Sequence, residues 1–182
     1  GRLKELNSSV GTLSPDFVNT TENYSIHLEG DENGTRLTGK VDDSRALVTG
    51  LDKFYEVEPG TVRHVVIIVT SDHGETKTYG VDISRDSYDD SIPSTKLKSL
   101  VIDGYETDID FQSNTLEYDI VLPKGEIDLT INAIPYDEDA IVTVENSKHI
   151  DQPEGTITVT VSKAGCEDTV YTINYTKYDN YD

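Results

Sequence analysis

Apolar and polar residues alternate with a period of two along several stretches of this sequence. The clearest alternation covers residues 24–28, 127–131, 157–161 and 170–175. Alternation of this kind places one side of a strand on a core and the other side in water. No window carries a sustained helical stripe with capping residues. The pattern therefore predicts strands along the whole chain and an all-β fold.

Short turn-forming segments join some of these strands into pairs. Residues 62–70 precede residues 76–84, and residues 155–162 precede residues 168–176. Both connections contain glycine, which favours a tight turn. We therefore predict one β-hairpin near the end of each half of the chain.

The apolar positions of the first half recur in the second half. At an offset of 94 residues, Leu3, Leu6, Phe17, Tyr24, Ile26 and Leu28 match Leu97, Leu100, Phe111, Tyr118, Ile120 and Leu122. At an offset of 92 residues, Val65, Ile67, Val69, Tyr79, Val81 and Ile83 match Ile157, Val159, Val161, Tyr171, Ile173 and Tyr175. Similarity at a fixed period indicates a duplicated unit. Because the repeated aromatic residues keep the same strand phase, we interpret them as core residues rather than as a ligand platform.

A polar, acidic segment with a proline separates the two copies, as is typical of a domain boundary. We predict a β-sandwich domain over residues 1–86, an acidic linker over 87–93 and a second β-sandwich domain over 94–182. The second domain ends in an acidic, tyrosine-rich tail. Because the chain runs from Gly1 directly into a patterned strand, we expect it to be part of a larger protein.

Composition and charge narrow the range of partners. The 182 residues include 11 tyrosines and many β-branched residues, which favour strands. A formal net charge of −20, from 35 acidic and 15 basic residues, is opposite in sign to the footprint of a nucleic-acid binder. The same charge disfavours anionic lipid, and no apolar run is long enough for direct membrane insertion. The single cysteine excludes an intrachain disulfide.

The first copy opens and closes on extended motifs. It opens with Leu3-x-x-Leu6-x-x-x-x-Gly11-x-Leu13-x-Pro15-x-Phe17 and closes with Tyr79-x-Val81-x-Ile83-x-Arg85. These motifs resemble the bacterial cadherin-like β-sandwich domain, and the resemblance covers residues 1–85 and 94–177. It implies two tandem immunoglobulin/cadherin-like β-sandwich domains from a secreted or wall-bound bacterial protein. The family has no catalytic residues to carry over.

Sequence motifs for catalysis are missing from the chain. There is no Gly-x-Ser-x-Gly elbow and no glycine-rich phosphate loop. None of the four histidines stands at a metal-binding spacing from a second strong ligand. We therefore expect that the chain is not an enzyme and holds no cofactor, with calcium as the one exception to consider.

Calcium is the cation that the acidic segments would suit, because it binds several oxygen ligands. Asp86, Asp89 and Asp90 lie in or beside the linker, where a cation would stiffen a two-domain chain. Further acidic runs cover residues 42–43 and 137–139. None of these matches the Asp-x-Asp-x-Asp-Gly loop pattern, so simple solvated acidic surface stays the alternative.

Two functions stay open at this point. The first is a non-catalytic extracellular adhesion or spacer module of a larger bacterial surface or secreted protein. It would position other domains of that protein or bind a protein ligand or polysaccharide at the cell surface or cell wall. The second is a carbohydrate-binding accessory module of a secreted polysaccharide-acting enzyme. Tyr105 and Tyr136 are the predicted ligand-binding residues of such a module.

Overall fold

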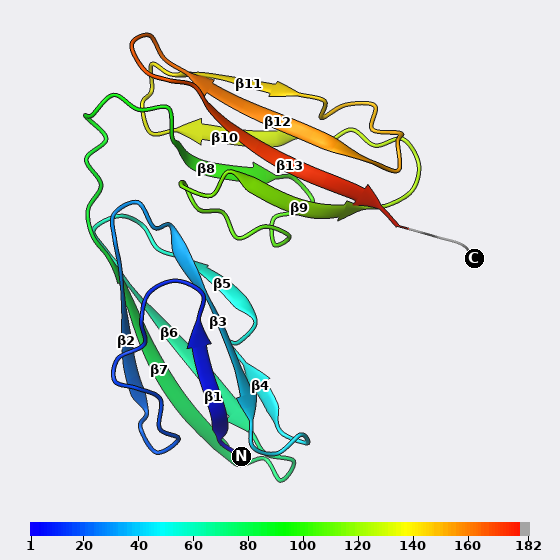
Figure 1. The fold of residues 1–182 in the computed structure, drawn as a ribbon. Helices are drawn as coiled ribbons and strands as arrows, with labels where there is room; N and C mark the ends of the chain where they lie inside the picture. The colour runs from blue at the N-terminus through cyan, green and yellow to red at the C-terminus, as the bar shows by residue number, and fades with distance from the viewer. Residues whose placement is uncertain (179–182) are drawn as a thin grey trace. The chain divides into compact units, whose positions relative to one another are not determined.

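The computed structural model describes residues 1–178, and the fold is all-β (Figure 1). The chain divides into two compact units, Gly1–Tyr88 and Asp89–Asp182, each with two sheets. The predicted fold class of two β-sandwich domains is confirmed. The division falls inside residues 87–93, and the domain limits 1–86 and 94–182 stay a prediction. Residues 179–182 of the predicted tail lie outside the described residues.

The first unit is built from two sheets with the strand orders β1-β3-β5 and β2-β7-β6-β4. Its strands are β1 (Leu3–Ser8), β2 (Asn23–Leu28), β3 (Gly34–Val41), β4 (Leu47–Thr49), β5 (Lys53–Glu56), β6 (Val62–Thr70) and β7 (Thr76–Arg85). Strand β2 runs parallel to β7, and the other neighbours are antiparallel. Buried side chains from both sheets, such as Leu3, Leu37, Ile26 and Ile67, form one core.

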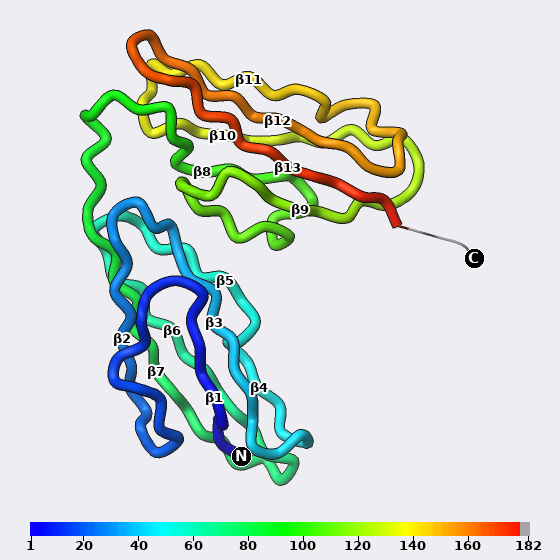
Figure 2. The backbone as a smooth tube through the Cα atoms, viewed as in Figure 1, coloured from blue at the N-terminus to red at the C-terminus, as the bar shows by residue number. Residues whose placement is uncertain are grey.

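The second unit has the sheet orders β10-β8 and β11-β12-β13-β9. Its strands are β8 (Leu97–Ile102), β9 (Glu117–Leu122), β10 (Ile131–Pro135), β11 (Ile141–Glu145), β12 (Glu154–Ser162) and β13 (Thr169–Lys177). Here β9 runs parallel to β13, just as β2 does to β7 in the first unit. The two predicted hairpins are confirmed as the antiparallel pairs β6–β7 and β12–β13 (Figure 2).

A tyrosine on the last strand of each unit ties the two sheets together. The Tyr79 hydroxyl accepts a hydrogen bond from Leu3 N at 3.2 Å, and the Tyr171 hydroxyl accepts one from Leu97 N at 2.9 Å. Both tyrosines are fully buried. The repeated hydroxyl therefore serves the fold, because each one satisfies the backbone at the start of the first strand.

The alternation over residues 127–131 predicts a strand that the structure does not form. Strand β10 begins only at Ile131, and Ile127 makes an isolated bridge to Ile150. Leu129 is buried, and its N–H donates to Ser147 O at 2.8 Å. The segment thus has the side-chain alternation of a strand, but its backbone bonds a loop instead of a neighbouring strand.

Within residues 1–178, no helix has the length and apolar character needed to cross a membrane.

Candidate functional site

The ends of the parallel strand pairs occupy equivalent places in the two units. Where β2 and β7 end, Asp86 N donates to Leu28 O at 3.0 Å. Where β9 and β13 end, Tyr178 N donates to Leu122 O at 2.9 Å. Because the same backbone bond closes both pairs, Asp86 and Tyr178 are equivalent positions. We call each of these places the strand-pair end.

At each strand-pair end a basic residue donates hydrogen bonds to the neighbouring loops. Arg85 donates from its guanidinium to Gly30 O and to Val57 O, each at 2.7 Å. Lys177 donates to Gly125 O and, at 2.6 Å, to Ile150 O. These bonds satisfy carbonyl groups of the neighbouring loops, which explains why a basic residue completes the closing motif of both copies.

The first strand-pair end brings together three side chains that could bind a metal. His27 and Glu29 are two residues apart on extended chain and therefore lie on one side of it. Asp86 follows the neighbouring strand, and its Oδ1 lies 2.8 Å from His27 Nε2. One ligand atom from each residue lies within 4.8 Å of the others, and all three residues are exposed. The hydrogen bond to Asp86 raises the pKa of His27 above its usual value.

A tight turn fixes Glu29 beside His27. Glu29 N donates to the Glu32 carboxylate at 2.7 Å, and Glu32 N donates back to Glu29 O at 3.1 Å. The negative charges of Glu29 and Glu32 also contribute to the raised pKa of His27. The turn therefore places two carboxylates near one imidazole, in addition to Asp86.

This cluster was not predicted from the sequence, in which no histidine stands at a recognised metal-binding spacing from a second strong ligand. The spacing of two residues between His27 and Glu29 was the available signal, because period two puts both on one side of a strand. The approach of Asp86 depends on the parallel pairing of β2 with β7. Local alternation does not reveal which strands become neighbours.

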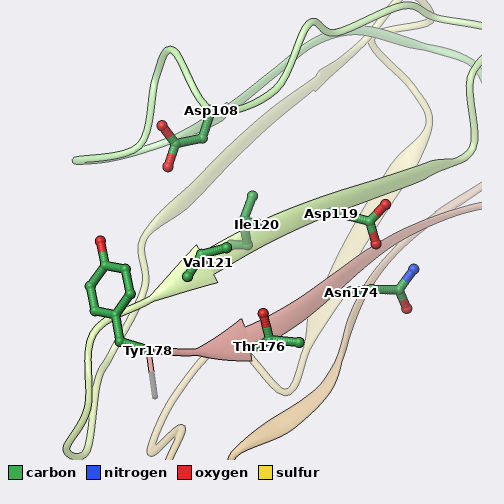
Figure 3. Close-up of a pocket in the computed structure, with 7 residues that line it drawn as sticks. All are labelled: Asp108, Asp119, Ile120, Val121, Asn174, Thr176 and Tyr178. Atoms are coloured by element: carbon green, nitrogen blue, oxygen red, sulfur yellow. The ribbon is translucent and has the colours of Figure 1, made fainter. Parts of the chain in front are cut away.

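The second strand-pair end has a different chemistry (Figure 3). Val121 and Tyr178 stand where the first unit has His27 and Asp86, and they line an open depression of about 370 Å³. Asp108, Asp119 and Asn174 contribute polar groups to the same depression. Tyr178 is about half exposed, with 52% of its surface accessible. The depression thus combines an exposed aromatic ring with hydrogen-bonding side chains.

The structure places the residues of the predicted calcium site as follows. Asp86 belongs to the first unit and bonds His27, whereas Asp89 and Asp90 belong to the second unit. The Asp89 carboxylate accepts hydrogen bonds from Ser91 N at 3.1 Å and Ser91 Oγ at 2.5 Å. These bonds lower the pKa of Asp89. Calcium binding by Asp86, Asp89 and Asp90 stays a prediction.

Asp90 borders an acidic depression of about 430 Å³ in the second unit. Lys163 Nζ lies in it, 3.0 Å from Asp137 and 3.9 Å from Asp139. Hydrogen bonds from Asp139 N and from Lys163 lower the pKa of Asp137. Because an ammonium group already neutralises part of this acidic run, a bound cation would have to displace it or add to its charge.

The two predicted ligand-binding tyrosines offer little ring surface. Tyr136 is 8% exposed, and Tyr105 is half-buried against the second core. A sugar stacks on an aromatic face, so a platform requires an exposed ring. Ligand binding by Tyr105 and Tyr136 stays a prediction, and the more exposed ring is that of Tyr178.

The exposed side of sheet β2-β7-β6-β4 carries an apolar surface. Val62, Val66 and Ile68 project from β6, and Leu47 projects from β4, with exposed fractions of 51%, 54%, 37% and 73%. We call these four residues the apolar face. The four strands contain a single carboxylate, Asp82, which bonds His64 Nδ1 at 2.6 Å.

The corresponding sheet of the second unit is polar and acidic. At the offset of 92 residues, Glu154, Thr158 and Thr160 replace Val62, Val66 and Ile68. The four strands of this sheet carry four exposed carboxylates, those of Glu117, Asp119, Glu145 and Glu154. Its exposed apolar residues are spread over three strands as Val121, Ile141 and Val170. The row of exposed apolar residues on β6 has no counterpart on β12, and it is therefore a property of the first unit and not a requirement of the fold.

Comparison with known proteins gives similarity to solved structures only. No family model matches the chain, and no curated protein matches it. The extracellular cadherin domains 3–6 of protocadherin gamma B2 are 9% identical, with a TM-score of 0.28, over 94% of this chain and 48% of that one. The immunoglobulin domains 1–4 of Sidekick-1 are 12% identical, with a TM-score of 0.31, over 94% and 52%.

A third similar structure is SGBP-B from the mixed-linkage glucan utilization locus of Bacteroides ovatus, in complex with a mixed-linkage heptasaccharide. It is 10% identical, with a TM-score of 0.28, over 96% of this chain and 71% of that one. The chain spans about half the length of the first cadherin structures that it matches.

Proposed function

We propose that the chain is a non-catalytic extracellular module of a larger bacterial surface or secreted protein. It positions the other domains of that protein at the cell surface or cell wall and binds a protein ligand. The observation that carries the binding role is the apolar face of the first unit. The partner it fits is a protein whose contact surface is apolar and carries few charges.

Charge supports the choice of this face. The chain carries a formal net charge of −20, so most of its surface repels an acidic partner and holds water strongly. The one carboxylate in the four strands of this sheet, Asp82, is bonded to His64. Interface centres are typically depleted of charged residues, and their apolar side chains are removed from water on binding.

The repeated polar groups support a non-catalytic role. The hydroxyls of Tyr79 and Tyr171 bond the backbone of the first strand in their units. Those of Tyr24 and Tyr118 bond the backbone at Val18 and Gln112. What the two units share is thus used to hold the fold, and what distinguishes them lies on the surface.

Site-specific photo-crosslinking tests the binding role. A photo-crosslinking amino acid replaces Val66 in one chain and, as the matched control, Thr158 in another. Each chain is exposed to the surface proteins of its source cells, with unlabelled competitor chains added. We expect one discrete adduct from position 66, competed by wild-type chain but not by a V66T/I68T chain.

The V66T/I68T competitor should bind about tenfold more weakly or worse, because each threonine buries a hydroxyl in place of an apolar group, a methyl at position 66 and an ethyl at position 68. An adduct with a second copy of the chain would identify that copy as the partner. Equal adducts from positions 66 and 158, or none that wild-type chain competes, would contradict the proposal.

A second candidate function is carbohydrate binding at the second strand-pair end. The depression of Figure 3 favours it, because exposed Tyr178 lies with Asp108, Asp119 and Asn174 around one open space. Stacking on an aromatic ring and hydrogen bonds to hydroxyl groups are what a sugar requires. Screening on a glycan array tests this. Retention that is lost in Y178A, but kept in Y105A and Y136A, would support this depression as the site.

A further inference from the structure

We propose that the first strand-pair end is a binding site for one divalent transition-metal ion of the zinc type. Its ligands are His27 Nε2 and one carboxylate oxygen each from Glu29 and Asp86. The ion would link the end of β2, the turn after it and the chain just past β7. This donor set differs from the predicted calcium set, with which it shares only Asp86.

The geometry requires only small side-chain movements. Zinc binds nitrogen and oxygen ligands at about 2.0–2.2 Å, so the donors of a tetrahedral site lie about 3.3–3.6 Å apart. His27 Nε2 and Asp86 Oδ1 are 2.8 Å apart and would separate slightly. All three donor atoms already lie within 4.8 Å of one another. Because the side chains are exposed, they can rotate without disturbing the core.

The donor chemistry selects the class of metal. One imidazole and two carboxylates suit zinc and neighbouring first-row ions. Calcium instead takes six to eight oxygen ligands and does not favour nitrogen. Three protein ligands leave the fourth position of a tetrahedral site to water, as an exposed site would allow.

The local negative charge favours binding of a divalent cation over protonation of His27. Three carboxylates, those of Glu29, Glu32 and Asp86, act on the single imidazole of His27. The nearby guanidinium of Arg85 donates to backbone carbonyls on the buried side. Protonation of His27 offsets one negative charge, whereas a divalent ion offsets the charges of both ligating carboxylates.

The internal repeat shows that the fold does not require these three residues. At the equivalent positions the second unit has Val121, Pro123 and Tyr178, and its strand pair closes with the same backbone bond. The chain also supplies a matched control. His64 Nδ1 lies 2.6 Å from Asp82 and so forms a similar histidine–aspartate pair. Within residues 1–178, however, a third potential metal ligand joins such a pair only at His27.

Isothermal titration calorimetry of the full chain with zinc chloride tests the site, with calcium chloride as the second probe. We expect one zinc ion per chain and no comparable calcium isotherm. H27V should weaken zinc binding at least about tenfold, and E29Q and D86N should each weaken it several-fold, because each removes a ligand. The H64V control should leave zinc affinity unchanged.

Amide spectra check that H27V is folded. We expect it to fold, because the second unit has a valine, Val121, at the equivalent position. In the same samples, zinc should shift the ring signals of His27 and leave those of His64 in place. Unchanged zinc affinity in folded H27V, an equal loss in H64V, or calcium binding as tight as zinc binding would each overturn the proposal.

Discussion

The two units carry buried apolar residues at equivalent positions but different surface residues around them. Leu3 and Leu97 are both fully buried at the start of their units. On the exposed side of the larger sheet, Val66 on β6 of the first unit corresponds to Thr158 on β12 of the second. Tight packing restricts which residues can occupy the buried positions, whereas most substitutions at exposed positions change stability little. The differences between the units therefore indicate where each has acquired its own role.

The largest expected effect comes from the shared core. L3A and L97A each remove a fully buried leucine side chain, and each should destabilise its own unit by about 2–5 kcal/mol. Amide hydrogen exchange, followed separately for the two units, measures this. Equal costs at both positions would support equivalent cores, and a negligible cost at either would break the equivalence.

A smaller effect is expected for the shared tyrosine hydroxyl. Y79F and Y171F keep the ring but leave the N–H of Leu3 or Leu97 without its partner in a buried place. Each should cost about 1–3 kcal/mol in the free energy of unfolding. Urea denaturation of the two variants provides the measurement. A neutral result in one unit alone would show that the hydroxyl is structural in the other unit only.

The surface positions should contribute little to stability. V66T/I68T gives the first sheet the residues of the second, and T158V/T160I makes the reverse change. Each pair should alter the free energy of unfolding by less than about 1 kcal/mol, because exposed positions usually contribute a few tenths each. Thermal unfolding measures both. A loss of several kcal/mol in V66T/I68T would assign the apolar face to the fold and not to binding.

The smallest effect concerns the exposed pair of His149 and Glu126 in the second unit. A hydrogen bond to Glu126 at 2.9 Å, with the charges of Asp128, Glu126 and Asp151, raises the pKa of His149. A raised folded-state pKa means that the stabilisation is fully present below the unfolded value and is lost as pH rises through the folded value. NMR titration should show the pKa of His149 falling toward 6.5 in E126Q. An unchanged pKa would mean that the carboxylates of Asp128 and Asp151, and not that of Glu126, raise the pKa of His149.

Much of the fold could be predicted from the sequence, because alternation and the internal repeat report burial directly. The matched residues Tyr79 and Tyr171 are buried as predicted. The segment 127–131 was mispredicted, since its side chains alternate while its backbone bonds a loop. The cluster of His27, Glu29 and Asp86 could not be predicted, because it depends on a parallel pairing between strands far apart in the sequence. Side-chain periodicity specifies which residues are buried but not which strand lies next to which.

Exchanging the two surfaces tests most directly the claim that a shared core carries a binding face specific to the first unit. The exchanged chain combines V62E and I68T with E154V and T160I, and carries the photo-crosslinking residue at position 66 or 158. We expect the competable adduct to weaken at position 66 and to appear at position 158, because the partner follows the apolar surface. An adduct that stays at position 66 with undiminished yield, in a folded chain, would contradict this claim.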